Sequence, residues 1–303
     1  MSAGTAGTAA RSLPLPSTAD ATIRDALVED RVDRDLTTAA VVPRPVVGRA
    51  RVVAQASGTV AGVEVAVRVA RAMGLRARGR VRDGARVRSG TVVVTVEGDA
   101  RRILSAERTL LNFLMHLSGV ATATRAAVEA AGSRSGGPRV FATRKTIPGL
   151  RDLEKWAVAV GGGFPHRRDL SAAMLVKNNH LQLVALPIAV TRARMGSGRS
   201  PGVQVEVRNP RDALTAVRAG ANALLLDNQS PASARRIVAA LEHARLRKGV
   251  WVELSGGITP RSIGRYRAVG ADAASLGSLT HSAPALPFHL TLVAARHARP
   301  RPP

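Results

Sequence analysis

The chain has 303 residues, of which 45 are Lys or Arg and 21 are Asp or Glu, so its formal net charge is +24. With 45% hydrophobic residues it can bury a core, and without cysteine it has no disulfide scaffold and no cysteine nucleophile or metal ligand. It contains no apolar run of about 18 residues and no signal-peptide pattern, so we expect a cytoplasmic protein without a membrane span.

The first third of the chain is typical of a small domain of mixed helices and strands. Residues 1–20 have the composition of a disordered lead, and short β-type runs with Gly and Asp between them follow. The runs are expected at residues 50–54, 75–81 and 91–96, with a helix at 63–73. A long helical region then covers residues 101–131, with a break expected near Ser118-Gly119. We place this N-terminal α/β domain and its connecting helix at residues 21–118.

The positive charge is carried almost entirely by arginine and is spread along the chain. Only four of the 45 cationic side chains are lysines, and the densest group of arginines lies at residues 75–88. Arginines alternate there with small apolar residues, which places them on one face of a strand. Aromatic residues, which stack on nucleic-acid bases, make up only 2% of the chain. We therefore favour a solvated strand face over a nucleic-acid-binding surface.

A repeating pattern of strand and helix begins after residue 135. Six short apolar runs end in polar residues, at 139–142, 173–176, 203–207, 223–226, 250–254 and 273–276. Helices are expected at 151–160, 210–219, 231–244 and 260–269. These β–α units predict parallel strands in a (β/α) barrel or a doubly wound sheet, with fewer strands than a full barrel has. We place this domain at residues 119–287 and a basic, Pro-rich tail at 288–303.

Polar residues follow these runs at the strand ends, where parallel α/β folds carry their sites. Two carboxylates, Glu206 and Asp227, suit Mg²⁺, which keeps water and phosphate ligands. Cationic side chains suit a small polyanion, and small loops donate backbone N–H groups to phosphate. The cations are Arg144, Lys145 and Lys177, and the loops are Ser255-Gly256-Gly257 and Gly277-Ser278.

Each signal has a simpler interpretation when it is taken alone. A single carboxylate is more often a cap or an ion-pair partner, and a Gly pair more often marks a tight turn. Gly161-Gly162-Gly163 is best explained as the end of a helix, and no His pair has zinc-ligand spacing with a third ligand. The occurrence of all three classes at strand ends favours a functional site.

Longer motifs also occur in a fixed order along the chain. They are Glu107-Arg108-Thr109-Leu110-Leu111-Asn112, Thr143-Arg144-Lys145-Thr146, Leu153-Glu154-Lys155, His166-Arg167, Leu175-Val176-Lys177-Asn178-Asn179-His180, Leu226-Asp227-Asn228, Ser255-Gly256-Gly257 and Gly277-Ser278. With these motifs the chain resembles the nicotinate-nucleotide pyrophosphorylases, also called quinolinate phosphoribosyltransferases (decarboxylating). The resemblance covers roughly residues 20–290.

The resemblance implies a fold and a reaction. The fold is α/β, with an N-terminal α/β sandwich-like domain and an incomplete (β/α) barrel. The reaction joins quinolinate to 5-phosphoribosyl 1-diphosphate (PRPP) with Mg²⁺ and gives nicotinate mononucleotide, pyrophosphate and CO₂ in NAD biosynthesis. It also implies a homodimer in which Arg108 of one subunit completes the site of the other.

The resemblance further assigns roles to individual residues. The quinolinate carboxylates are expected at Arg144, Lys145, His166, Arg167 and Lys177. Glu206 and Asp227 are expected on the ribose and Mg²⁺-pyrophosphate side, and both are the candidate metal ligands. The 5′-phosphate is expected at Ser255, Gly256, Gly257, Gly277 and Ser278, and Thr143 and His281 complete the substrate-binding set. Lys145, Lys177, Glu206 and Asp227 are the catalytic candidates.

The chain departs from the family pattern at five positions. Ala142, Pro165, Ala172, Asn178 and Leu254 stand where the family usually has Asp, Asn, an acid, an acid and Ala. Three of these changes remove an acid near the site. Phosphoribosyl transfer is therefore a firmer expectation than quinolinate as the acceptor. Two alternatives stay open: a paralogue that uses another small (hetero)aromatic carboxylate, and a non-catalytic basic binding protein.

Overall fold

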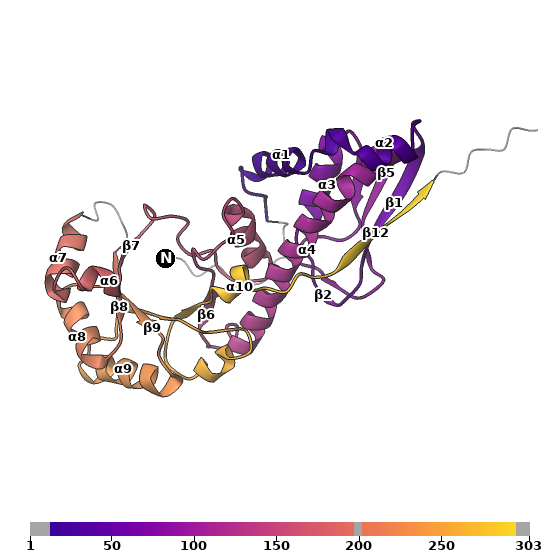
Figure 1. The fold of residues 1–303 in the computed structure, drawn as a ribbon. Helices are drawn as coiled ribbons and strands as arrows, with labels where there is room; N and C mark the ends of the chain where they lie inside the picture. The colour runs from indigo at the N-terminus through magenta and orange to yellow at the C-terminus, as the bar shows by residue number, and fades with distance from the viewer. Residues whose placement is uncertain (1–12, 197–201, 295–303) are drawn as a thin grey trace, which may run out of the picture. The chain divides into compact units, whose positions relative to one another are not determined.

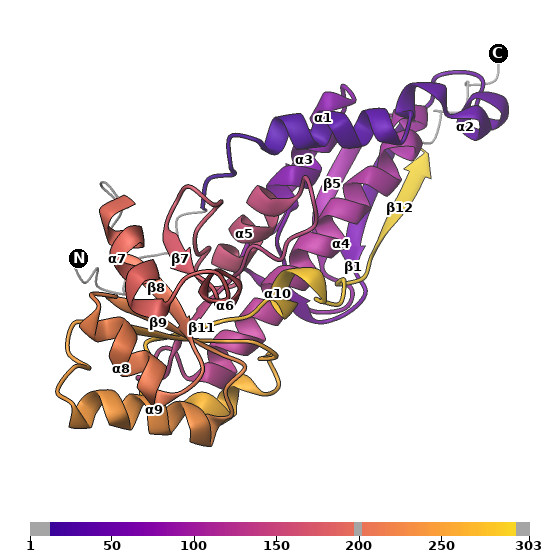
Figure 2. The ribbon, with the colours of Figure 1, turned by 60° about the vertical axis from the view of Figure 1, so that its left-hand side comes forward.

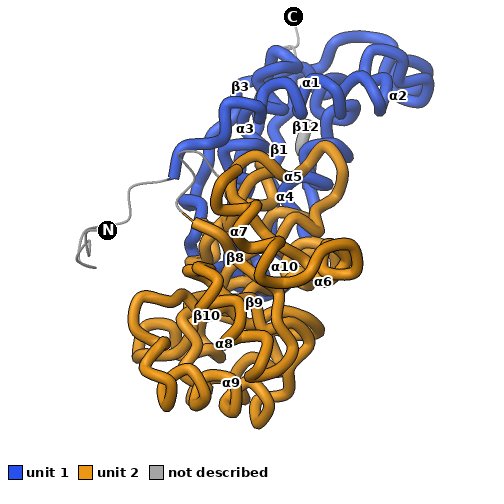
Figure 3. Tube along the Cα trace, turned by 90° about the vertical axis from the view of Figure 1, so that its left-hand side faces the viewer, with its two compact units in different colours: residues 1–115, 286–303 blue, residues 116–285 orange. Residues whose placement is uncertain are grey.

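A four-stranded antiparallel sheet forms the centre of the first of two structural units. Its strands follow the order β12-β1-β5-β3, and they are β1 (Val47–Ala54), β3 (Arg76–Gly79), β5 (Val92–Asp99) and β12 (Phe288–Ala294). The structure is a computed structural model that describes residues 13–196 and 202–294. The two units comprise residues 1–115 with 286–303, and residues 116–285 (Figure 3).

One face of this sheet forms the core of the first unit. Alternate residues of β1 are buried, among them Ala50 and Val52, and α3 (Val63–Ala72) packs on β3 and β5. Asp83 accepts a 2.9 Å hydrogen bond from the Val63 N–H at the first turn of α3. The remaining elements are α1 (Ala19–Glu29), η1 (Val32–Arg34), α2 (Leu36–Val41), β2 (Gly58–Thr59) and β4 (Arg86–Val87).

The other face of the sheet carries exposed arginines. Arg76 and Arg78 on β3 are exposed, and so are Arg49 and Arg51 on β1. Arg49 and Arg76 both form ion pairs with Glu97, at 3.3 and 3.6 Å. This arrangement confirms the predicted strand face with its arginines in solvent.

The predicted tail and the predicted helix break are both corrected by the structure. Residues Phe288–Ala294 form β12, which pairs antiparallel with β1 (Figure 2), and residues 295–303 lie outside the described residues. Helix α4 (Ala100–Ala131) is continuous through Ser118-Gly119. Gly119 is needed for close packing, because a Cβ there would lie 2.3 Å from the Pro284 carbonyl oxygen. Of the expected lead, residues 1–12 are not described, and α1 begins at Ala19.

The second unit contains a parallel sheet with all six predicted strands. Its order is β6-β11-β10-β9-β8-β7, and the strands are β6 (Arg139–Phe141), β7 (Met174–Val176), β8 (Val203–Val207), β9 (Ala223–Asp227), β10 (Trp251–Ser255) and β11 (Ala273–Ser275). In Figure 1 these strands curve around a centre, with α7, α8 and α9 on the outside. The sheet stays open between β6 and β7, which confirms the incomplete barrel.

Helices connect these strands, mostly where the sequence predicts them. They are α5 (Arg151–Val160), α6 (Asn178–Leu181), α7 (Leu186–Gly196), α8 (Pro210–Arg218), α9 (Pro231–His243) and α10 (Ser278–His281). The helix expected at 260–269 is only a short 3₁₀ turn, η2 (Ile263–Tyr266), because Gly264 in its middle disfavours an α-helix. Within the described ranges, no helix is both long enough and apolar enough to cross a membrane.

Candidate active site

The carboxyl ends of the six parallel strands surround a cavity of about 550 Å³ in the second unit. Every strand, or the segment that follows it, contributes to the lining. Nine of the residues predicted for the site line this cavity: Thr143, Arg144, Lys145, His166, Arg167, Lys177, Glu206, Asp227 and Ser255. Seven of them meet because parallel strands all end at the same edge of the sheet, and His166 and Arg167 come from the irregular segment before β7.

Cationic side chains from the segments that follow β6 and β7 line the cavity. Burial and the charge of Arg144 lower the pKa of the Arg167 guanidinium, because the two cations repel each other. Arg144 Nε is buried and has no hydrogen-bond partner among the described residues. An anion with several oxygen atoms would accept this hydrogen bond and relieve the repulsion.

Two carboxylates from neighbouring strands also line the cavity. Glu206 on β8 and Asp227 on β9 lie on paired parallel strands. Burial, and then the charge of Asp227, raise the pKa of Glu206 above its usual value. Two carboxylates that repel each other suit a divalent cation. The two carboxylates fit Mg²⁺, which takes few protein ligands and keeps water and phosphate as its other ligands. The described residues contain no group of three or more His, Cys, Asp or Glu that could hold a metal ion.

Asn178 stands beside this carboxylate pair, where the family pattern has an acid. Its side-chain amide donates a hydrogen bond to Glu206 Oε1, and its backbone N–H lies 3.4 Å from Glu206 Oε2. The backbone hydrogen bond lowers the pKa of Glu206 and so opposes the effects of burial and Asp227. A neutral donor thus holds Glu206 where an acid would have added a third negative charge.

The glycine loops lie at the strand ends, and most of their residues do not line the cavity. Gly256 and Gly257 have φ values of +86° and +62°, and a Cβ on Gly256 would lie 2.7 Å from the Asn228 backbone nitrogen. A Cβ on Gly277 would lie 2.8 Å from Lys145 Cδ, so this loop packs behind Lys145. Outside the lining are Gly256, Gly257, Gly277, Ser278 and His281. Arg108 is an exposed residue of α4 in the first unit.

The structure adds Glu253, which the sequence-based prediction did not include. Its side chain is 4% exposed, and His166 Nε2 lies 3.2 Å from Oε1 while Gln204 Nε2 donates to Oε2 at 3.0 Å. Burial acts to raise the pKa of Glu253, but hydrogen bonds from His166, Ser275 and Gln204 together hold it below its usual value. The sequence signal was a charged residue inside the apolar run at 250–254. Other lining residues that were not predicted are Leu175, Asn179, Gln204, Arg208, Leu225, Asn228 and Ser275.

The other departures from the family pattern fall at different distances from the cavity. Ala142 lines it, whereas Leu254 is buried in β10 and Ala172 is exposed outside the lining. Pro165 precedes His166, which has a left-handed backbone with φ +57°. The His166 ring packs edge-on against Phe141, with the ring centres 5.9 Å apart.

An incomplete α/β barrel with cations, paired carboxylates and glycine loops at its strand ends defines a protein suited to small anionic and phosphorylated substrates. Residues 35–118 match the family profile "Quinolinate phosphoribosyl transferase, N-terminal domain" and residues 120–291 match "Quinolinate phosphoribosyl transferase, C-terminal domain". The chain belongs to the quinolinate phosphoribosyl transferase family.

Known proteins agree with this assignment along most of the chain. The chain is 42% identical over 262 residues to the probable nicotinate-nucleotide pyrophosphorylase [carboxylating] of Methanothermobacter thermautotrophicus, covering 86% of this chain and 94% of that protein. It is 38% identical over 276 residues to the nicotinate-nucleotide pyrophosphorylase [carboxylating] of Mycobacterium leprae, covering 89% and 96%. The crystal structure of NadC from Streptococcus pyogenes superposes with a TM-score of 0.85 at 35% identity, covering 94% of this chain and 100% of that one.

Proposed function

We propose that this protein joins quinolinate to PRPP and releases nicotinate mononucleotide, pyrophosphate and CO₂, as a step of NAD biosynthesis. The observation that carries this proposal is one cavity that combines a cationic group with a carboxylate pair at the strand ends. The names of the relatives support it, since "carboxylating" describes the same reaction in the reverse direction.

In this proposal the cations bind the two carboxylates of quinolinate. The Arg144 guanidinium has an unpartnered buried Nε, and Arg167 is held by a 3.0 Å hydrogen bond from its Nη1 to the Ala173 carbonyl. Lys145 and Lys177 add two point charges at the ends of β6 and β7. The dianion would be fixed with its ring nitrogen toward the ribose, so that the reaction gains from positioning.

The carboxylates act at the ribose end. The ring nitrogen attacks the anomeric carbon as the bond to pyrophosphate breaks, and positive charge develops on the ribosyl group. Glu206 and Asp227 stabilise that charge electrostatically when both are ionised. When bound with PRPP, Mg²⁺ neutralises charge on the pyrophosphate, and Glu206 and Asp227 are the residues that would hold it.

Loss of CO₂ completes the reaction. The bond from the ring carbon to its 2-carboxylate breaks, and the electron pair stays on the carbon beside the cationic ring nitrogen. That carbon then takes up a proton. The cations of the cavity hold the substrate while this negative charge develops.

The proposed assembly is a cytoplasmic homodimer in which Arg108 of one subunit reaches the acceptor bound by the other. The exposure of Arg108 on α4 is compatible with such a role.

The test is a turnover assay with purified protein, PRPP, Mg²⁺ and quinolinate, in which nicotinate mononucleotide and CO₂ are measured together. Equal amounts of the two products are expected. Nicotinate is the matched control acceptor, because it lacks the 2-carboxylate. Turnover of another small aromatic carboxylate in place of quinolinate would favour the paralogue. The absence of turnover with either substrate class would favour a binding protein.

A further inference from the structure

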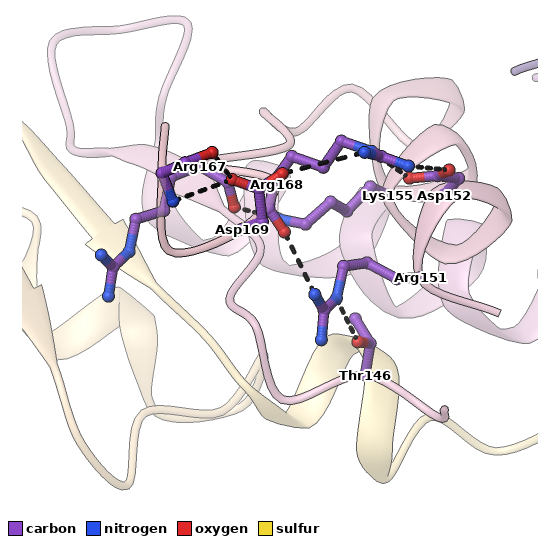
Figure 4. Close-up of polar contacts among 8 residues, drawn as sticks. Thr146, Arg151, Asp152, Lys155, Arg167, Arg168 and Asp169 are labelled. Atoms are coloured by element: carbon purple, nitrogen blue, oxygen red, sulfur yellow. Dashed lines mark hydrogen bonds and ion pairs between the residues drawn. The ribbon is translucent and has the colours of Figure 1, made fainter. Parts of the chain in front are cut away.

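Three residues of α5 hold the segment that carries His166 and Arg167 (Figure 4). The Lys155 ammonium donates hydrogen bonds to the carbonyl oxygens of Pro165 and, at 2.9 Å, of Arg167. Arg151 Nη1 lies 3.4 Å from the Arg168 carbonyl oxygen. Asp152 accepts two 2.8 Å hydrogen bonds from the Arg168 guanidinium. One helix therefore binds three carbonyls and one side chain of residues 165–168.

This segment has little other support from regular structure. Residues 165–173 form neither helix nor strand, and Pro165 has no N–H to donate. His166 adopts a left-handed backbone, which is costly for a residue other than glycine and persists only where the surroundings enforce it. Nevertheless, His166 and Arg167 both line the cavity. Their side chains can be placed reproducibly only if their backbone is fixed from outside the segment.

Lys155 is well placed for this task. Its side chain is nearly buried, with 5% of the residue exposed, and Lys155 is not among the residues that line the cavity. The charged groups around it are Arg151 and Asp152 on its own helix, Arg144 after β6, and Arg167 in the segment. Three of these four are cations, so they repel the lysine ammonium. An apolar residue would fill the same space more cheaply.

The neighbouring residue Glu154 holds the segment that follows β6 and carries Arg144 and Lys145. Glu154 is fully buried, accepts a 3.1 Å hydrogen bond from the Ile147 N–H, and lies 2.8 Å from His116 Nε2. Arg151 Nε also donates to Thr146 Oγ1 at 3.1 Å. Consecutive residues of α5 therefore secure both segments that bring cations into the cavity.

We propose that Lys155 is a positioning residue, whose ammonium tethers the Pro165 and Arg167 carbonyls and so sets where His166 and Arg167 meet the acceptor carboxylates. This inference rests on the proposed acceptor. Burial, and then the nearby arginines, lower the pKa of Lys155 to about 8. Above that pH the tether loses its charge and weakens, so acceptor binding should weaken as well.

The test compares Lys155→Met with Lys248→Met, which makes the same change at an exposed lysine. Quinolinate binding to Lys155→Met should weaken about ten- to hundredfold, the usual effect of losing a hydrogen bond from a charged group. PRPP binding should change by less than about twofold, since PRPP is expected at the other strand ends. A role in stability alone would lower the melting temperature and leave the quinolinate Kd unchanged.

Two further measurements test the role of Lys155 separately from the proposed function and from the folding of the variant. Trypsin should cut after Arg167 and Arg168 faster in Lys155→Met than in wild type or Lys248→Met, whatever the acceptor is. In wild type, quinolinate affinity should fall as the pH rises through 8, which needs no variant to fold. Wild type that binds no quinolinate while Lys155→Met shows faster cleavage would reject the proposed function and keep the tether. Unchanged cleavage, unchanged quinolinate affinity in Lys155→Met, or a wild-type affinity constant between pH 7 and about 9.5 would overturn the tether.

Discussion

Replacement of Asn178 by Asp tests how the carboxylate pair is controlled. The change removes the amide donor to Glu206 Oε1 and places a third carboxylate beside Glu206 and Asp227. Two unit charges about 4 Å apart near a protein surface interact by about 4 kcal/mol. Because the cavity is open to water and the new side chain can turn away, we expect about half of this, or a rise of ~1–2 units in the pKa of Glu206.

The sign of the pH effect follows from the role of Glu206. The wild-type pKa of Glu206 is already raised, so activity that needs the ionised form falls as the pH drops through that value. In Asn178→Asp the acid limb of the kcat/KM profile should move to higher pH by ~1–2 units. Asn178→Ala is the matched control, because it removes the hydrogen bond without adding charge, and its limb should move much less.

The assay is the pH dependence of kcat/KM at one subsaturating Mg²⁺ concentration for all three proteins, since the metal competes with protons for the same oxygens. An acid limb that is the same in wild type and Asn178→Asp would refute the reasoning, because Glu206 would then not control that limb. A shift of equal size in Asn178→Ala would trace the effect to the hydrogen bond and not to charge.

Further predictions concern packing, the buried carboxylate and the dimer. Gly119→Ala should lower the free energy of unfolding by about 1–3 kcal/mol in denaturant unfolding through its clash with Pro284. Gly196→Ala should be neutral or stabilising, because among the described residues a Cβ there meets only Met174 Cε, at 3.9 Å. Glu253→Gln should lower the free energy of unfolding by about 1–3 kcal/mol at pH 7. Because the pKa of Glu253 is lowered on folding, this difference should be present at neutral pH and shrink as the pH falls through the folded-state pKa; a constant difference would contradict the assignment. Inactive Arg108→Ala and Lys177→Ala proteins, mixed to form hybrid dimers, should regain about a quarter of wild-type activity, and no recovery would argue against a shared site.

The barrel was predictable because its signal is local. Each buried strand is a short apolar run, and the polar residue that ends it is read directly from the sequence, as with Leu226 followed by Asp227. Parallel order then brings those ends to one edge without knowledge of any contact. For this reason seven of the nine predicted residues in the cavity could be found at strand ends, whereas His166 and Arg167 were predicted only from the family resemblance.

The missed features depend on partners far away in the sequence. Phe288-His289-Leu290-Thr291-Leu292 alternates like a strand, but its partner β1 lies at the other end of the chain, and the Pro- and Arg-rich residues beyond it favoured a tail. Glu253 was missed because its partner, His166, lies 87 residues earlier in the chain. Gly119 was interpreted as a helix breaker because the approach of Pro284 is not visible in local sequence.

The pairing of β12 with β1 also bears on how the chain is made. The barrel is inserted between β5 and β12 of the first sheet, so all of its strands leave the ribosome before that sheet can be completed. Until residues 288–294 are synthesised, one edge of β1 has no partner strand, and such an edge is prone to pair with other chains. The second unit can therefore finish folding before the first unit. This reverses the usual order, in which the N-terminal domain folds first during synthesis. A released chain that ends before Phe288 would contain every strand of the barrel but an open first sheet, the state in which it would most need a chaperone.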